Sequence, residues 1–367
     1  MTQSEDDHRF MRAAIRLSTQ HLGLTFTNPS VGALVVQKIK NSSVIVGRGV
    51  TAPGGRPHAE KIALSEAGSA ARGATAYVTL EPCSHYGQTP PCALALIEAK
   101  IARVVIALQD PDQRVSGQGI KLLRDAGIEV IIGVEEFYAR TTLNGYLTFK
   151  TMMRPEITVK MALSQDNGIG KFCRGAVKIT NQTSHNQVHI LRAQTDAIMV
   201  GINTVLADDP LLTCRLPGLE HRSPIRIVID PALRLPVGSR LVSSATKAPL
   251  WVFTHVQFDS DKKQLLEQKH VLVLPLPMLN EKVDLLSLAK QLRTRNITTL
   301  LVEGGAKTVE YLIAQNLVDR LQIFSSGHAI GEFKVNAPQF ESLKQCYVHL
   351  RHENLDGDMY DEWMRTD

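Results

Sequence analysis

The sequence predicts an α/β protein made of two domains. The chain has 367 residues, which is longer than one typical domain. In both halves, short runs rich in β-branched residues alternate with stretches of helical periodicity, and this alternation is typical of helices packed on sheets. A second run of the same kind begins after Arg154-Pro155. We therefore expect one domain over residues 1–150 and another over residues 151–367.

The first half should fold as a three-layer α/β domain. Phe10, Met11 and Ala14 recur at helical spacing near the start, and Pro57 suits the first turn of a later helix. The first two strands should form a hairpin across a polar turn. The expected helices cover 4–22, 57–67, 92–100 and 119–126, and the expected strands cover 31–37, 44–50, 76–80, 104–108 and 129–133. Residues 137–153 should form a helical or extended connector.

The second half carries a further α/β pattern, unrelated to the first by any internal repeat. The expected strands cover 157–162, 197–200, 225–230, 250–254, 271–274, 299–303 and 320–325. Glu303-Gly304-Gly305 would end a strand and open a helix, where backbone N–H groups can approach a phosphate, although a glycine pair there also fits an ordinary tight turn. No Gly-x-Gly-x-x-Gly follows a strand, so the conventional dinucleotide fingerprint is missing.

Composition and charge narrow the classes of partner. The chain is 44% hydrophobic and 21% charged, with a formal net charge of +5, which is ordinary for a globular protein. So weak a basic excess does not call for nucleic acid and suits a phosphorylated small molecule. No stretch approaches the roughly 20 apolar residues that span a bilayer, and the acidic start lacks a signal-peptide pattern. We expect a cytoplasmic protein with neither a nucleic-acid nor a membrane partner.

One constellation in the first half points to zinc chemistry. His58-Ala59-Glu60 is followed by Cys83 after a proline and by Cys92 after two prolines, which fits the zinc-deaminase signature H-x-E followed by P-C-x-x-C. The departure is the eight residues, 84–91, that separate the two cysteines. Catalytic zinc takes three protein ligands and leaves one position for water, so His58, Cys83 and Cys92 would hold the ion. Glu60 would carry the protons.

Other interpretations of this constellation stay open at the level of residues. The five cysteines, an odd and sparse set, favour metal binding or plain burial over a disulfide framework; they are Cys83, Cys92, Cys173, Cys214 and Cys346. A closed structural zinc site would need a fourth ligand, for which His85 is nearest, and the chain would then be a nucleotide-binding regulatory module. Alternatively, the substrate would be a nucleoside, nucleotide or tRNA base, with an accessory α/β domain; the nearly neutral charge weighs against tRNA.

The motifs resemble those of a known family along nearly the whole chain. The segment from Pro82 to Cys92, with its long insert and its Thr89-Pro90-Pro91 run, looks like the signature of the bifunctional riboflavin-biosynthesis deaminase/reductase family. Four segments of the second half are similar to the reductase domain of that family: residues 160–168, 191–193, 204–210 and 302–305. Both halves match in the right order.

The resemblance implies a fold and two reactions. The fold would be a cytidine-deaminase-like three-layer domain followed by a dihydrofolate-reductase-like domain. The first domain, with one zinc ion, would hydrolyse the amino group of a diamino-ribosylaminopyrimidinone phosphate and release ammonia. The second would use NADPH to reduce the ribose of the product to a ribityl chain, and we hypothesise that the ring-opened sugar imine is reduced. The partner is then a phosphorylated pyrimidine, and we expect a homo-oligomer.

The resemblance also assigns residues. Zinc falls on His58, Cys83 and Cys92, Glu60 donates the proton, and Asn28 contacts the pyrimidine edge or ribose. The NADPH site would comprise Ala162, Lys178, Thr204, Asp208, Gly305, Ala306, Lys307, Thr308, Val309, Glu310 and Tyr311. The substrate site of the reductase would comprise Ala176, Arg192, Leu212, Arg215 and Glu303. The two arginines suit a phosphate because the guanidinium fork matches its oxygens.

One stretch departs from the family pattern. Many members carry a Ser and a Trp two apart before an Ile-Thr pair, whereas residues 175–180 here read Gly-Ala-Val-Lys-Ile-Thr. The hydroxyl and the indole are therefore missing at Ala176 and Lys178, and Lys178 would offer charge to a cofactor phosphate instead. Nearby, Asn167 stands where Gly is common, which predicts a left-handed turn that Asn tolerates.

Overall fold

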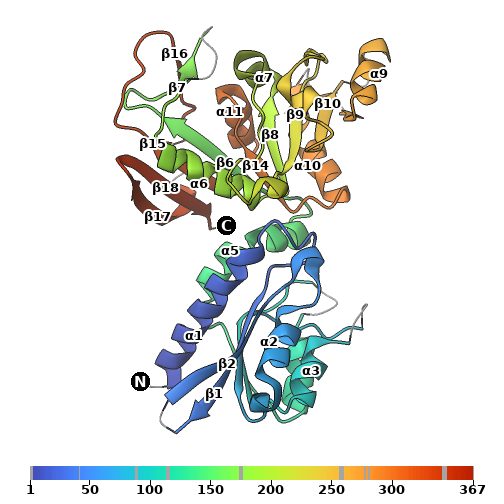
Figure 1. Cartoon of the computed structure of the whole chain (residues 1–367), viewed down its shortest axis with the longest axis vertical. Coiled ribbons are helices and arrows are strands. Elements are labelled where there is room, and N and C mark those ends of the chain that lie inside the picture. The colour runs from blue at the N-terminus through green and yellow to red at the C-terminus, as the bar shows by residue number, and fades with distance from the viewer. Residues whose placement is uncertain are drawn as a thin grey trace. The chain divides into compact units, whose positions relative to one another are not determined.

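The chain folds as two compact units, residues Met1–Arg154 and Pro155–Asp367 (Figure 1). The computed structural model describes residues 3–40, 42–86, 90–112, 116–172, 177–255, 260–276, 278–279, 282–340 and 345–366. Among these residues, no helix combines the length and the apolar character that crossing a membrane would require.

Unit 1 is a three-layer α/β sandwich, as predicted. Its described residues form a five-stranded sheet in the order β2-β1-β3-β4-β5, in which β3, β4 and β5 are parallel. The strands are β1 (Gly32–Ile39), β2 (Ser42–Val50), β3 (Thr75–Leu80), β4 (Arg103–Leu108) and β5 (Glu129–Ile132). The first two strands form the expected antiparallel hairpin.

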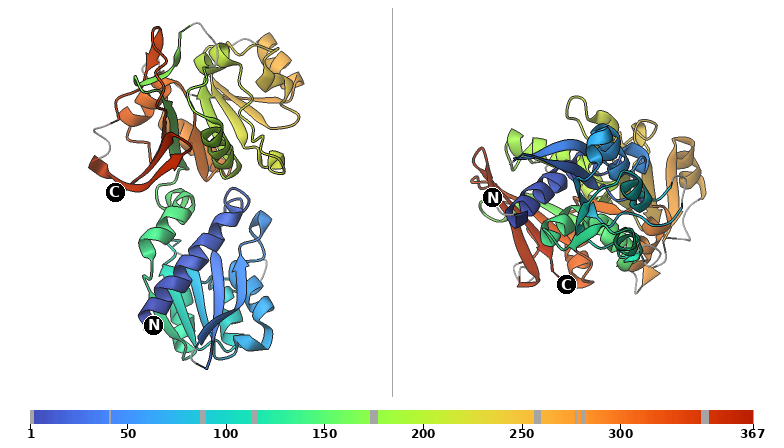
Figure 2. Two further views of the ribbon diagram at one scale, coloured as in Figure 1. Left: turned by 60° about the vertical axis from the view of Figure 1, so that its left-hand side comes forward. Right: turned by 90° about the horizontal axis from the view of Figure 1, so that it is seen from below.

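Helices cover both faces of this sheet. Figure 2 shows α1 (Gln3–Ser18) and α5 (Glu136–Thr151) side by side on one face. The other face carries α2 (Ala59–Ala67), α3 (Cys92–Glu98) and α4 (Gln118–Asp125). Short 3-10 turns are η1 (Thr19–His21), η2 (Pro53–Gly55) and η3 (Gly68–Ala71). The connector predicted as helical or extended is the helix α5.

A close backbone approach fixes where α2 begins. A side chain added at Gly49 in β2 would place its Cβ 2.1 Å from the carbonyl oxygen of Ala59, the first residue of α2. Only glycine leaves room for that contact. The first turn of α2 carries His58 and Glu60, so the packing of α2 on β2 positions both side chains.

A buried ion pair holds α1 against the sheet. Arg103 in β4 donates two hydrogen bonds of 2.7 Å to the carboxylate of Asp7 in α1, and the Tyr77 hydroxyl of β3 donates a third at 2.9 Å. Arg103 also reaches Glu129 at 3.1 Å. Removal of Asp7 leaves the largely buried Arg103 with only the exposed Glu129 as a counter-charge, so the pair is costly to break.

We therefore predict that Asp7→Ala destabilises unit 1 by ~3–5 kcal/mol. The measurement is amide hydrogen exchange of β3 and β4, which reports the free energy of opening of this unit. Asp125→Ala is the control, since Asp125 pairs with Lys121 at 2.7 Å on the exposed surface and such pairs contribute little. Equal exchange in the two variants would contradict the role given to Asp7.

Unit 2 is built on a mixed sheet that includes every strand predicted for it. The described residues form a nine-stranded sheet in the order β11-β10-β9-β8-β14-β6-β15-β18-β17. The parallel strands are β6 (Glu156–Leu163), β8 (Ala197–Gly201), β9 (Ile225–Ile229), β10 (Leu250–Thr254), β11 (Val271–Pro275), β14 (Thr299–Val302) and β15 (Arg320–Ser325). The antiparallel edge hairpin is β17 (Tyr347–Leu355) and β18 (Asp358–Arg365).

The remaining elements of unit 2 are helices and two small ribbons. The ribbons are β7 (Gly168–Lys171) with β16 (Lys334–Asn336), and β12 (Met278–Leu279) with β13 (Lys282–Val283). The helices are α6 (Gln182–Ala193), α7 (Ile202–Asp208), α8 (Arg240–Ser243), α9 (Ser260–Gln268), α10 (Leu285–Thr294), α11 (Ala306–Ala314) and the 3-10 turn η4 (Glu220–Arg222). Between β6 and β7, Asn167 has a φ of 61°, so the predicted left-handed turn is confirmed.

Two hydrophobic clusters lie on opposite faces of the parallel strands. Met199 of β8 packs with α10 and α11, whereas its neighbours Ile198 and Val200 pack with α7, α8 and α9. This alternation follows from the two-residue repeat of a strand.

The connections define where a ligand would bind. From β6 the chain crosses over β14 to reach β8 on one side of the sheet. From β14 it crosses over β6 in the opposite direction to reach β15. Ligands of open α/β sheets bind outside the carboxyl ends of the strands where the connections diverge in this way. In unit 2 that point lies at the ends of β6, β8 and β14.

Candidate functional site

Three side chains of unit 1 converge as a potential metal centre. His58 is the N-cap residue of α2, Cys83 lies just beyond β3, and Cys92 is the first residue of α3. The Nδ1 atom of His58 is 3.7 Å from the Cys83 sulfur and 3.3 Å from the Cys92 sulfur. All three ligand atoms lie within 4.8 Å of one another. The residues that the sequence named as ligands are thus brought together.

The donor set and its spacing fit zinc. Zinc–nitrogen and zinc–sulfur bonds of ~2.0 and ~2.3 Å in a tetrahedron separate the nitrogen and sulfur atoms by about 3.5 Å, close to both observed distances. The hydrogen bond with Cys92 and the contact with His58 lower the pKa of the Cys83 thiol to about 4, so the sulfur is available as a thiolate. The backbone N–H of Cys92 also donates to it at 3.3 Å.

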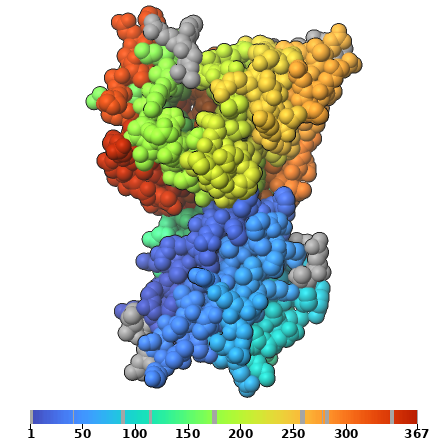
Figure 3. Space-filling view, viewed as in Figure 1, coloured from blue at the N-terminus to red at the C-terminus, as the bar shows by residue number. Residues whose placement is uncertain are grey.

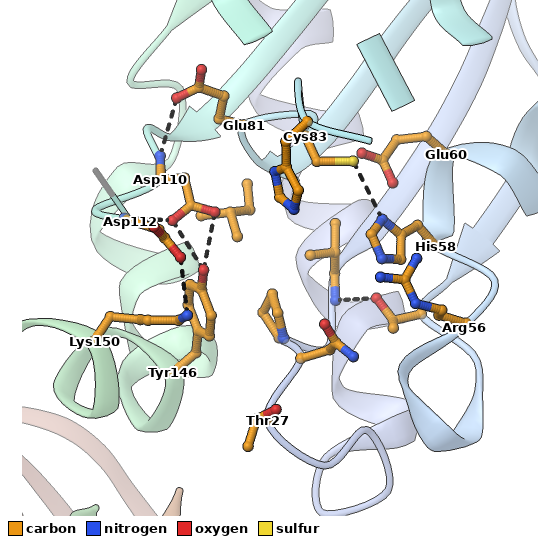
Figure 4. A pocket seen from close by; sticks show the side chains of 16 residues that line it. Thr27, Arg56, His58, Glu60, Glu81, Cys83, Asp110, Asp112, Tyr146 and Lys150 are labelled. Carbon is orange, nitrogen blue, oxygen red and sulfur yellow. Dashed lines mark hydrogen bonds and ion pairs between the residues drawn. The ribbon is translucent and has the colours of Figure 1, made fainter. Parts of the chain in front are cut away.

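The centre opens onto a cavity of about 270 Å³ (Figure 4). An open side is what distinguishes catalytic from structural zinc, since substrate must reach the metal. His85, considered as a fourth ligand, lines the cavity but does not join the three-residue cluster. The cavity is lined by Thr27, Asn28, Pro29, Val31, Thr51, Arg56, His58, Glu60, Leu80, Glu81, Cys83, His85, Asp110, Asp112, Tyr146 and Lys150.

Glu60 combines burial with access to the cavity. It is the second residue of α2 and only 5% exposed, and its side chain lines the pocket beside His58 and Cys83 (Figure 4). Burial, followed by the negative charge of Cys83, raises the pKa of Glu60 to about 7. A carboxyl group with such a pKa can both accept and return a proton near neutral pH.

The opposite wall of the cavity was missed by the sequence analysis. Asp110 accepts a hydrogen bond of 3.0 Å from the Tyr146 hydroxyl, and Lys150 contacts Asp112 at 3.0 Å (Figure 4). Tyr146 and Lys150 lie on α5, the segment that the sequence predicts as a helical or extended connector. The available signal was the Asp110-Pro111-Asp112 run, which begins two residues after the end of the strand expected at 104–108, because strand ends carry functional residues in such sheets.

A buried glutamate joins the two walls. Glu81 follows β3 directly and is 4% exposed. One of its oxygens accepts from the backbone N–H groups of Gly119 at 2.9 Å and Ile120 at 3.2 Å. The other accepts from Gly117 at 3.0 Å and Asp110 at 3.3 Å. The segment that carries Cys83 is therefore fixed relative to the loop that carries Asp110.

In unit 2, a second glutamate pairs with basic side chains at the carboxyl ends of the strands where the connections diverge. Glu303 follows β14 and binds the Arg192 guanidinium through two hydrogen bonds of 2.8 and 3.0 Å. Lys160 of β6 lies 3.7 Å from the same carboxylate. Arg192 also donates to the carbonyl of Thr213 at 3.1 Å. The Arg192 guanidinium is thus already hydrogen-bonded within the protein. Of the two predicted phosphate ligands, the exposed Arg215 is the more accessible.

Positive charge exceeds negative charge around this glutamate. Burial, followed by the charges of Arg192 and Arg215, lowers the pKa of His189 to about 4. The pKa of His185 is lowered by burial and by four nearby cations: Lys160, Lys178, Arg192 and Arg215. An anionic group would relieve this repulsion, as a phosphate does among arginines. Lys160, His185 and His189 were not among the predicted site residues.

The predicted NADPH residues divide into two groups. At the ends of β8 and β14, a Cβ added to Gly305 would lie 3.6 Å from the Thr204 hydroxyl, and one on Gly201 would lie 2.9 Å from that of Thr308. The N-terminal ends of α7 and α11 therefore lie against each other at the ends of β8 and β14. Several other predicted residues are half-buried or exposed: Ala162, Lys178, Asp208, Ala306, Lys307, Glu310 and Tyr311.

Three predicted residues of unit 2 need separate mention. The Val309 side chain is buried in the core cluster with α10, so only its backbone could face a ligand. Leu212 is buried with a φ of 57°, which lies in the left-handed region of the backbone. Ala176 lies outside the residues that the structure describes.

Comparisons with known proteins agree for both units. Residues 155–357 match the RibD C-terminal domain, and residues 4–108 match the cytidine and deoxycytidylate deaminase zinc-binding region. The chain is 40% identical to the riboflavin biosynthesis protein RibD of Aquifex aeolicus over 97% of each protein. It is 35% identical to the RibD of Escherichia coli, over 95% of this chain and 97% of that protein.

Solved structures agree with the sequence relatives. RibD of Acinetobacter baumannii is 30% identical with a TM-score of 0.84, and the match covers 100% of both chains. A diaminohydroxyphosphoribosylaminopyrimidine deaminase/5-amino-6-(5-phosphoribosylamino)uracil reductase of Thermotoga maritima is 31% identical with a TM-score of 0.84, also over 100% of both. The predicted order of a deaminase-like and a reductase-like domain is confirmed. The chain belongs to the RibD family of riboflavin biosynthesis proteins.

Proposed function

We propose that this chain catalyses two consecutive steps of riboflavin biosynthesis. Unit 1 removes an amino group from a diamino-ribosylaminopyrimidinone phosphate by hydrolysis, and unit 2 reduces the ribose of the product with NADPH. The observation that carries the first step is the three-ligand centre of His58, Cys83 and Cys92 beside the buried Glu60 in an open cavity. The second step is supported by family membership and by the cation-rich end of β14.

In the first step, water adds to the ring carbon that bears the amino group, and the carbon–nitrogen bond then breaks. Zinc, when bound, supplies the Lewis acidity that makes water a competent nucleophile near neutral pH. Glu60 takes a proton from the attacking water and delivers it to the ring nitrogen. It then carries the proton of the newly formed hydroxyl group to the leaving amine, which departs as ammonia. The burial of Glu60 suits this proton transfer, because burial disfavours the charged carboxylate and so makes the protonated form accessible.

The wall opposite Glu60 suits recognition of the ring and its substituent. Asn28 lines the cavity and offers an amide with both donor and acceptor groups. Asp110, Asp112 and Lys150 add charged groups on the far side. A ring held between the two walls would have its amino group directed at the centre formed by His58, Cys83 and Cys92.

In the second step, NADPH would supply a hydride to the anomeric carbon of the ring-opened sugar imine, and the imine nitrogen would take a proton from solvent. The cofactor performs the chemistry, and the protein supplies placement. The N-terminus of α11 would receive a cofactor phosphate, with Gly305 and Thr204 close together at its base. The substrate phosphate would bind Arg215. The positive side chains in this region outnumber the single negative charge of Glu303, so an added anion is favoured there.

The metal centre predicts a clear dependence on its sulfur ligands. Cys83→Ser and Cys92→Ser should each lose most of the bound zinc and the ammonia-releasing activity, because a hydroxyl is a poor zinc ligand beside a thiolate. Zinc content per chain and ammonia release measure both effects. The exposed Cys346 provides the matched control, and Cys346→Ser should keep zinc and activity. Full zinc in all three variants would contradict the assigned ligands.

Glu60→Gln separates catalysis from metal binding. We expect this variant to retain zinc while ammonia release falls by ~10²–10⁴-fold, the usual contribution of a general acid–base. NADPH oxidation with the deaminated substrate should be unchanged, which shows that the chain is folded. A variant that releases ammonia at the normal rate would instead support a structural zinc site.

Arg215→Ala tests phosphate recognition in unit 2. The KM for the deaminated substrate, followed by NADPH absorbance, should rise by about ten- to a hundredfold, since a hydrogen bond to a charged group is lost. Ammonia release should not change. Arg295→Ala removes an exposed guanidinium at the end of α10 and serves as the control. If both variants give the normal KM, Arg215 does not bind the phosphate.

A further inference from the structure

A cluster of metal-ligating side chains lies on the C-terminal hairpin of unit 2, and it shares no residue with the groups discussed for either reaction. His349 and His352 of β17 face Asp361 of β18. The Nε2 atom of His349 is 2.8 Å from one Asp361 oxygen, and the Nδ1 atom of His352 is 2.7 Å from the same oxygen. The three ligand atoms lie within 4.8 Å of one another. The C-terminal part of unit 2 is drawn in red in Figure 3.

A β-bulge creates this convergence. Residues three apart on a regular strand point to opposite faces of the sheet. Here the pairing slips between His349 and Arg351, so that His349 pairs with Trp363 and His352 pairs with Asp361. Trp363 and Asp361 are two apart on β18 and share its half-buried face, whereas Tyr360 and Glu362 on the other face are buried. The extra residue therefore brings both imidazoles onto the face of Asp361.

Aromatic packing holds one of the two ligands in place. The His349 ring stacks on the Trp363 indole, with ring centroids 4.0 Å apart and planes at 11°. Its nitrogen is thereby aimed at the carboxylate before any ion binds, which reduces the entropy lost on coordination. His352 is exposed and can adjust.

The chemistry of the three ligands defines the class of ion. Two imidazoles and one carboxylate favour first-row divalent transition metals over calcium or magnesium, which prefer oxygen. Ideal metal–ligand bonds of ~2.1 Å at right angles separate nitrogen and oxygen by about 3.0 Å, near both observed separations. Exposure of the histidines leaves the remaining coordination positions to water.

We infer that His349, His352 and Asp361 form a second metal site, which takes a divalent transition ion such as Ni²⁺ or Zn²⁺. Its residues are distinct from those of the zinc centre in unit 1 and from those assigned to either reaction. Coordination ties β17, the edge strand of the large sheet, to β18 across the bulge. A bound ion would therefore stabilise this edge, because it binds the folded hairpin and not the unfolded chain.

The stacked tryptophan supplies a direct readout. The chain has two tryptophans, Trp251 and Trp363, so Trp251→Phe leaves only the indole that touches His349. In this background, loaded with one zinc ion per chain so that only the centre in unit 1 is filled, titration with Ni²⁺ should quench Trp363 fluorescence saturably. Added Zn²⁺, which is not a quencher, should compete with Ni²⁺ and restore the emission.

Variants of the ligands decide the outcome. His352→Ala leaves the His349–Trp363 stack intact and should weaken Ni²⁺ binding by at least about a hundredfold, because loss of even an outer partner of a ligand costs 10–100-fold. Asp361→Asn should also weaken it. His221→Ala, at an exposed histidine outside the cluster, should bind Ni²⁺ normally. Absence of saturable quenching in the parent, or equal quenching in His352→Ala, would overturn the site.

Discussion

A buried glutamate directly after a central parallel strand organises the site in each unit. Glu81 follows β3 and accepts four backbone hydrogen bonds, which fix the loop of Asp110 beside the segment of Cys83. Glu303 follows β14 and holds Arg192 and Lys160. In both units the carboxylate lies where strand ends leave room for a ligand. The geometry of each candidate site therefore depends on satisfying one buried negative charge.

The surroundings of the buried glutamates decide which of them can exchange a proton. Burial raises the pKa of Glu303, but the adjacent Arg192 and Lys160 outweigh it and bring the pKa down to about 2. Glu303 is therefore a fixed anion. Glu60 is also buried, yet it faces the thiolate of Cys83, and its pKa rises to about 7. The same residue type thus serves as an anchor in one unit and as a proton carrier in the other.

The sequence was informative where local pattern or chemistry determines structure. It predicted the three layers of unit 1, the parallel strands of unit 2 and the convergence of His58, Cys83 and Cys92, because periodicity and ligand spacing are local signals. It missed Tyr146 and Lys150, whose role depends on α5 packing beside the loop of Asp110. It also missed β17, since that strand is mostly exposed and lacks an alternating apolar pattern. The bulge that unites His349 and His352 is set by strand pairing, which no local signal reveals.

The central claim is that the two units act in series on one phosphorylated pyrimidine, with deamination first. The most direct measurement supplies the zinc-loaded protein with the diamino-pyrimidinone ribosyl phosphate and NADPH and follows ammonia and NADPH absorbance together. The account predicts that ammonia appears first and that NADPH oxidation follows after a lag. At completion, the amount of NADPH oxidised should equal the amount of ammonia released. NADPH oxidation that precedes ammonia, or ammonia release with NADPH untouched, would contradict it.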